Sequence, residues 1–185
     1  GQYEKTVRLP AFGFFANSLG PGQVVVYKGT HVDDPRYTYR LHFYEVKGDS
    51  ANLVSVNAPY PLEYHRYSRS EGGCFSRTGN GKLLHYHPFS DTIYQITAET
   101  IEPYVVMDYQ DKAVPLKYKK SVRNYLDYLE TQADVQNHIE RPNLFWETES
   151  QIFVKSYDNN QCFETFYDKA GNRSRTVPCK RLGRG

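Results

Sequence analysis

The segment that most constrains this chain is residues 161–179, QCFETFYDKAGNRSRTVPC. Aromatic and β-branched side chains on both sides of a turn at residues 168–172 predict a β-hairpin. Gly171 and Asn172 suit the turn because both tolerate positive φ. Cys162 and Cys179 stand at the two outer ends of this hairpin and could face each other across it. We therefore expect a disulfide that closes the hairpin.

The cysteines also indicate a compartment. The chain has three, and one disulfide plus one spare thiol, Cys74, is typical of a secreted protein. Spacing leaves open that Cys74 pairs with Cys162 or Cys179 instead. The sequon that begins at Asn172 lies at the predicted turn, where a glycan could be attached. Because the chain begins with Gly1 and without Met, we interpret it as a mature, processed or trimmed product.

Composition limits the class of protein. The 185 residues are 39% hydrophobic and 24% charged, which fits one soluble domain. The net charge of +2 does not predict a nucleic-acid partner, and no segment reaches the roughly 18 apolar residues of a membrane span. Seventeen tyrosines and ten phenylalanines are typical either of a tyrosine-rich β surface or of a binding face.

The residue pattern predicts an α+β fold made mainly of antiparallel β-sheet, as a curved sheet, a sandwich or a partial barrel. Residues 36–46 alternate between an apolar face and a wet face that holds Arg40 and His42. Apolar residues three and four apart predict one long amphipathic helix over residues 117–138, packed on a sheet. We expect a single domain over 1–185, with residues 1–21 as an N-terminal arm and the strands and hairpin of 142–182 packed on the same core.

One stretch resembles a known family. Residues Pro142–Phe145, the alternating run Thr148–Lys155 and the run Glu164–Arg173 are together similar to the opening hairpin of animal secreted LolA-like domains, an architecture that ependymin-related proteins share. The resemblance implies a strongly curved antiparallel sheet wrapped over helix, with an apolar cavity for a lipid-like ligand. It implies no catalytic residues.

From these observations we expect a secreted, non-catalytic protein that binds an apolar or amphipathic, lipid-like ligand between the sheet and the helix. No cofactor is expected. The expected ligand-binding side chains are Tyr37, Tyr39, Leu41, Phe43, Tyr125 and Leu129. The alternative is an extracellular structural or coat component that self-associates, as a homo-oligomer or with another extracellular protein, through its tyrosine-rich β surface.

A third hypothesis is a metal-dependent enzyme. His85 and His87 are two residues apart on a predicted strand, so both could reach one metal ion. The spacing from Gly79 is similar to the first motif of cupins, but the second motif of that family is absent. Alternatively, His85 and His87 are ordinary residues on the solvent-facing side of a strand. Cys74 with a nearby histidine could form a nucleophile, although a buried or disulfide-bonded cysteine explains it equally.

Overall fold

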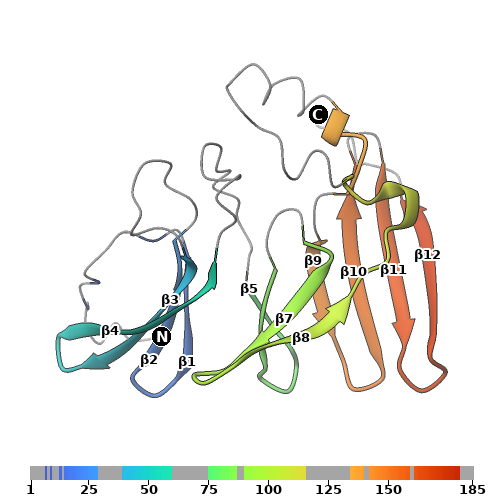
Figure 1. The fold of residues 1–185 in the computed structure, drawn as a ribbon. Coiled ribbons are helices and arrows are strands. Elements are labelled where there is room, and N and C mark those ends of the chain that lie inside the picture. The colour runs from blue at the N-terminus through green and yellow to red at the C-terminus, as the bar shows by residue number, and fades with distance from the viewer. Residues whose placement is uncertain are drawn as a thin grey trace, which may run out of the picture. The chain divides into compact units, whose positions relative to one another are not determined.

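The computed structural model describes residues 7, 9, 13, 15–28, 39–59, 75–86, 90–115, 134–139, 142–158 and 161–179. These residues form three antiparallel sheets of four strands each (Figure 1). In every sheet the strands follow one another in chain order, and each pairs with the next. Each sheet is therefore a simple meander, built from local hairpins.

The first sheet consists of β1 (Phe15–Gly20), β2 (Gln23–Tyr27), β3 (Tyr39–Lys47) and β4 (Ser50–Pro59). The second consists of β5 (Phe75–Arg77), β6 (Leu83–His85), β7 (Thr92–Ile96) and β8 (Ile101–Val106). The third consists of β9 (Pro142–Glu147), β10 (Gln151–Tyr157), β11 (Cys162–Asp168) and β12 (Arg173–Cys179). A short 3-10 helix, η3 (Gln110–Lys112), follows β8.

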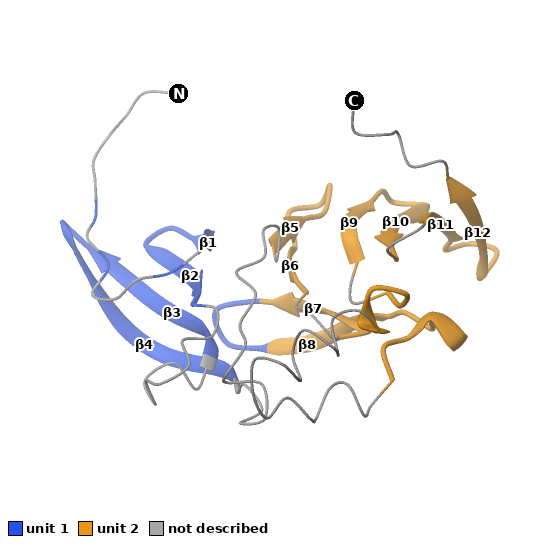
Figure 2. Cartoon of the chain, turned by 90° about the horizontal axis from the view of Figure 1, so that it is seen from above, with its two compact units in different colours: residues 1–72, 97–100 blue, residues 73–96, 101–185 orange. Residues whose placement is uncertain are grey.

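The chain divides into two compact units (Figure 2). Unit 1 contains the first sheet, whose β1–β2 and β3–β4 turns place Gly22 and Gly48 at positive φ, where glycine is favoured. Strand β3 is buried on both faces: Arg40 and His42 are 5% and 6% exposed, and Leu41 is fully buried. The wet face predicted for this strand is therefore wrong.

Unit 2 contains the second and third sheets. Leu84, Tyr86 and Ile93 form one core cluster with residues of the third sheet, chiefly Phe145 and Val154. The first strands of the two sheets, β5 and β9, lie next to each other, and the Ser76 hydroxyl donates to the Phe145 carbonyl oxygen at 3.1 Å. One hydrophobic core therefore holds these two sheets together.

The predicted α+β class is wrong, because the described residues are built almost entirely from β-strands and contain no long helix. Residues 117–133 of the predicted helix lie outside the described residues. Of its described residues, Asp134 and Val135 are helical, and a turn follows in which the His138 amide donates to the Val135 carbonyl at 2.9 Å. The chain then continues into a parallel bridge between Ile139 and Ala113. Val135, at the helical end of this segment, and Ile139, in the bridge, are both buried.

The N-terminal region also differs from its prediction. Residues 15–20 of the expected arm form β1, which pairs along β2 as an edge strand of the first sheet. The strand predicted at residues 62–67 lies outside the described residues. No helix in the described part of the chain is long and apolar enough to cross a membrane.

Candidate ligand pocket

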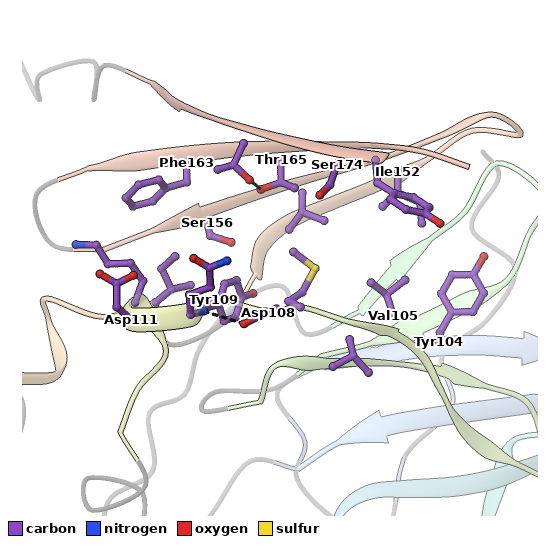
Figure 3. A pocket seen from close by; sticks show the side chains of 18 residues that line it. Tyr104, Val105, Asp108, Tyr109, Asp111, Ile152, Ser156, Phe163, Thr165 and Ser174 are labelled. Atoms are coloured by element: carbon purple, nitrogen blue, oxygen red, sulfur yellow. Dashed lines mark hydrogen bonds between the residues drawn. The ribbon is translucent and has the colours of Figure 1, made fainter. Parts of the chain in front are cut away.

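A pocket of about 730 Å³ lies within unit 2, between one face of the third sheet and the chain segment that follows from β8 through η3 (Figure 3). The sheet contributes alternate residues, because side chains on a strand point to its two faces in turn. The lining residues from the sheet are Ile152, Val154 and Ser156 of β10, Phe163, Thr165 and Tyr167 of β11, and Ser174 and Thr176 of β12. The opposite wall comprises residues 104–112 and Ile139.

One part of the pocket is apolar. Ile152 and Val154 are buried members of the core cluster of unit 2, and Val105 and Met107 pack against that cluster from the opposite wall. The apolar lining is thus continuous with the hydrophobic core. This continuity gives the apolar surface a fixed backing, so the pocket is held open by packed strands.

Another part of the pocket carries hydroxyl groups. The hydroxyls of Thr165 and Thr176 lie 2.9 Å apart across β11 and β12, and Ser174 stands next to them on the same face. Ser156 and Tyr109 line the pocket from opposite walls. Burial raises the pKa of Tyr109 to about 12; the nearby Ser156 side chain acts in the lowering direction, and the charge of Asp91 adds to the increase. Tyr109 therefore stays a neutral hydroxyl at physiological pH. Among the described residues the buried Tyr109 hydroxyl has no hydrogen-bond partner.

Most charged groups of the pocket take part in an ion pair or a hydrogen bond. The Lys112 ammonium lies 3.1 Å from the buried Asp158 carboxylate, which also accepts from the Gln161 amide at 2.7 Å. Asp108 accepts from the Gln110 amide at 3.0 Å and so holds the start of η3. Asp111 is the remaining carboxylate of the lining, and it is exposed. Among the described lining residues there is no histidine or cysteine.

At one end of the pocket, Tyr104 is held by a buried carboxylate. Its hydroxyl donates to both oxygens of Glu147, at 2.6 and 2.8 Å, and the Lys169 ammonium contacts the same carboxylate. The Lys82 ammonium lies 4.6 Å from the centre of the Tyr104 ring. These contacts fix the Tyr104 ring, which forms part of the pocket wall.

The described residues of the predicted ligand-binding set do not line this pocket. Leu41 and Phe43 are buried in unit 1. They belong to strand β3, which is buried on both faces. Tyr39 begins that strand, and only its backbone is described. Tyr37, Tyr125 and Leu129 lie outside the described residues.

The predicted histidine pair is only partly described. His85 is buried at the end of β6, and its ring centre lies 5.5 Å from that of Phe75. His87 and Cys74 lie outside the described residues. Within the described part of the chain, the one group of potential metal ligands that comes together is Cys162, Glu164 and Cys179, and two of its members form a disulfide. The described residues therefore offer no support for a metal centre at His85.

The predicted hairpin and its disulfide are confirmed. Cys162 and Cys179 are opposite each other in the β11–β12 register, are bonded, and have Cα atoms 5.0 Å apart. Asn172 is exposed in the turn, at a φ of 49°, and its side-chain oxygen accepts from the Tyr167 hydroxyl at 2.9 Å. Glycosylation of Asn172 stays a prediction.

Comparison with known proteins identifies the meander sheets. A family model described as a 6-bladed beta-propeller matches residues 2–184. The chain belongs to this family. Each four-stranded sheet is thus a propeller blade, and the described residues contain three of them. The earlier resemblance to LolA-like and ependymin-related domains is wrong, because its hairpin is the outer half of an ordinary blade.

A solved structure shows the same fold. A protein of Bacteroides fragilis described as exported matches 92% of this chain, with a TM-score of 0.70 and 19% sequence identity. The match covers 47% of that protein, so this chain spans about half its length. No curated protein matches the chain in sequence. The comparison therefore supports the propeller fold and leaves the ligand to be argued from the pocket.

Proposed function

We propose that the chain belongs to an exported, non-catalytic protein that binds a small amphipathic molecule in the pocket of unit 2. The observation that carries this proposal is the two-sided lining: Val105, Met107 and Val154 form an apolar wall, and the Thr165 and Thr176 hydroxyls face the same space. The volume of about 730 Å³ falls in the range of roughly 300–1,000 Å³ found for small-molecule sites.

The charge of the pocket narrows the ligand class. Lys112, the only ammonium among the described lining residues, is paired with Asp158, whereas the Asp111 carboxylate is exposed. An anionic head group would therefore meet a carboxylate without a free cation to balance it. We infer that the ligand has an apolar body and an uncharged or cationic polar head, which the hydroxyl groups would hydrogen-bond.

Two observations support export. The disulfide between Cys162 and Cys179 is of a kind that persists in oxidising compartments and is rare in the cytosol. The Bacteroides fragilis protein with the same fold is described as exported. We further propose that the protein is secreted beyond the cell and not kept in the periplasm.

A titration with a neutral apolar probe, N-phenyl-1-naphthylamine, tests the pocket. We expect its fluorescence to rise on binding, and the anionic probe 1-anilinonaphthalene-8-sulfonate to bind more weakly. The change Thr176→Trp places a large ring in the pocket and should weaken neutral-probe binding at least tenfold. Arg175→Trp is the matched control, because Arg175 is the next residue of β12 and points to the opposite face. Equal probe binding by the two variants would contradict the proposal.

A further inference from the structure

One hydroxyl group in the pocket wall is buried without a hydrogen bond to any described residue. Tyr109 lies directly before η3 and lines the pocket from the wall that faces the third sheet (Figure 3). Its hydroxyl oxygen is buried, and no described group accepts from it or donates to it. Most buried polar groups in proteins are paired, and a buried tyrosine usually finds a partner for its hydroxyl. Tyr109 therefore offers the pocket a hydrogen-bond donor that the described residues do not use.

Hydrogen bonds fix the backbone on both sides of Tyr109. The Lys112 amide donates to the Tyr109 carbonyl at 2.9 Å. On the preceding side, the Asp108 carboxylate accepts from the Gln110 amide at 3.0 Å. The Lys112 carbonyl in turn accepts from the Ile139 amide at 2.7 Å. The donor is thus held in place in advance, so a ligand that uses it needs little reordering of this wall.

A second hydroxyl group lies close to the first. Ser156 lines the pocket from β10 on the opposite wall and is 4% exposed. Burial raises the pKa of Tyr109, whereas the Ser156 side chain acts in the lowering direction, which indicates that the two side chains are close. A serine hydroxyl can donate as well as accept, and a carbonyl oxygen has two lone pairs. Both hydroxyls can therefore donate to one carbonyl oxygen placed between the two walls.

The charges near Tyr109 favour an uncharged acceptor. The charge of Asp91 adds to the effect of burial on the pKa of Tyr109, so a negative charge acts at this hydroxyl. Asp108 and Asp111 bring two more carboxylates to the same wall, and the Lys112 ammonium is already in an ion pair. A carboxylate or phosphate oxygen beside Tyr109 would be repelled by these groups. The oxygen of an ester, an amide or a ketone avoids this repulsion.

We propose that the Tyr109 hydroxyl donates a hydrogen bond to an uncharged carbonyl oxygen of the ligand, and that Ser156 supplies the second hydroxyl at that oxygen. The ligand class then narrows to apolar molecules that carry an ester, an amide or a ketone. This inference rests on the proposed function, because it concerns the same pocket. An apolar ligand without an acceptor would leave the Tyr109 hydroxyl buried and unpaired, so Tyr109 determines specificity.

Two uncharged naphthalene probes test this inference. N-phenyl-1-naphthylamine has no carbonyl group, whereas 6-propionyl-2-dimethylaminonaphthalene has one, and its emission moves to longer wavelength when that carbonyl accepts a hydrogen bond. Tyr109→Phe should weaken binding of the carbonyl probe about threefold to tenfold more than binding of the other probe, because one neutral hydrogen bond is lost. The emission of the bound carbonyl probe should move to shorter wavelength. Equal losses for the two probes, or an unchanged emission, would overturn the proposal.

Tyr157→Phe is the matched control. Tyr157 follows Ser156 on β10 and points to the face opposite the pocket, so its hydroxyl should not affect either probe. Without a probe, Tyr109→Phe should keep or raise the urea midpoint of unfolding, because the Tyr109 hydroxyl has no partner to lose among the described residues. A lower midpoint would show that this hydroxyl is bonded within the protein and would overturn the proposal.

The two probes also separate this inference from the proposed function on which it rests. If neither probe binds the unmodified chain, the pocket does not take a small amphipathic molecule and the proposed function fails. If both probes bind and Tyr109→Phe weakens them equally, the proposed function stands and only the role of Tyr109 is wrong.

Discussion

The Tyr104 hydroxyl donates to both carboxylate oxygens of Glu147, at 2.6 and 2.8 Å. This contact joins β8 of the second blade to β9 of the third, 43 residues further along the chain. The Glu147 side chain is 4% exposed, and its second partner is the Lys169 ammonium from the β11–β12 turn. A buried carboxylate therefore ties the two blades of unit 2 at one end of the pocket.

Replacing Tyr104 by Phe should destabilise the chain because the buried Glu147 carboxylate loses a donor. We expect the free energy of unfolding to fall by about 1–3 kcal/mol in urea denaturation at pH 7. Tyr94→Phe, on the neighbouring strand β7, serves as a control for loss of a tyrosine hydroxyl. An equal loss in both variants would show that the Glu147 contact has no special weight.

The same contact predicts a pH dependence. Burial, the hydrogen bond with Glu147 and the charge of Glu147 raise the pKa of Tyr104 from 10.0 to about 12. A raised pKa in the folded state means that this tyrosine contributes stability below pH 10, which is lost as the pH rises towards 12. The stability difference between the unmodified chain and Tyr104→Phe should therefore shrink between pH 10 and 12. A difference that stays constant over this range would argue against the assignment.

The terminal hairpin shows what could be predicted from the sequence. Its turn residues, its strand composition and its two cysteines all indicate the same local structure, and β11, β12 and the disulfide follow that prediction. The Asp168 carboxylate further fixes the turn by accepting from the Ala170 and Gly171 amides. Local features of this kind are encoded by neighbouring residues, so a single sequence is sufficient to find them.

The fold class could not be predicted in the same way, because it depends on how sheets pack. In β3, the alternation of Arg40, Leu41 and His42 indicated one wet face, yet both faces are buried. A strand in a blade is covered on both sides, so polar side chains such as Arg40 and His42 are buried there and alternation does not reveal a solvent-facing side. The three meanders share no recognisable sequence motif, so the sequence does not predict that one four-stranded blade is repeated.

The pocket was missed for a related reason. The alternation of Ile152, Val154 and Ser156 predicts that they share a face, but not which segment lies opposite. The opposite wall, from Tyr104 to Lys112, combines the end of a strand with a short 3-10 turn, and it is placed by pairing with β7 and by the bridge to Ile139. Long-range contacts of this kind leave no local pattern in the sequence.

Loss of the disulfide should destabilise the chain without abolishing the fold of the third blade. Cys162 and Cys179 are 17 residues apart, and a cross-link over a loop of that size contributes about 3 kcal/mol. The double change Cys162→Ser and Cys179→Ser should lower the free energy of unfolding by that amount in urea. Cys74→Ser is the control and should have no comparable effect. Alkylation of the unreduced, denatured chain at Cys74 alone would verify the pairing independently, and alkylation at Cys162 would contradict it.

Lys28 is a buried cation that should reduce the stability of unit 1. Its side chain is fully buried, and among the described residues its ammonium has no hydrogen-bond partner; the Tyr44 ring centre lies 5.9 Å away. Burial lowers the pKa of Lys28 below 10.5, because the charged form loses its hydration. Lys28→Met retains most of the side-chain volume and removes the charge. We expect it to raise the free energy of unfolding by roughly 1–3 kcal/mol at pH 7.

The sign of the pH dependence separates this explanation from a simple gain in hydrophobic packing. With a lowered pKa in the folded state, the unfolded chain binds more protons, so the stability of the unmodified chain rises as the pH approaches 10.5. The gain in the free energy of unfolding from Lys28→Met should therefore be largest near neutral pH and shrink towards pH 10.5.

Lys47→Met is the control, because the Lys47 side chain is 68% exposed and its ammonium lies 2.9 Å from the Glu45 carboxylate. Its stability should remain within about 0.5 kcal/mol of the unmodified chain. An advantage of Lys28→Met that does not change with pH would mean that packing, and not the buried charge, is responsible.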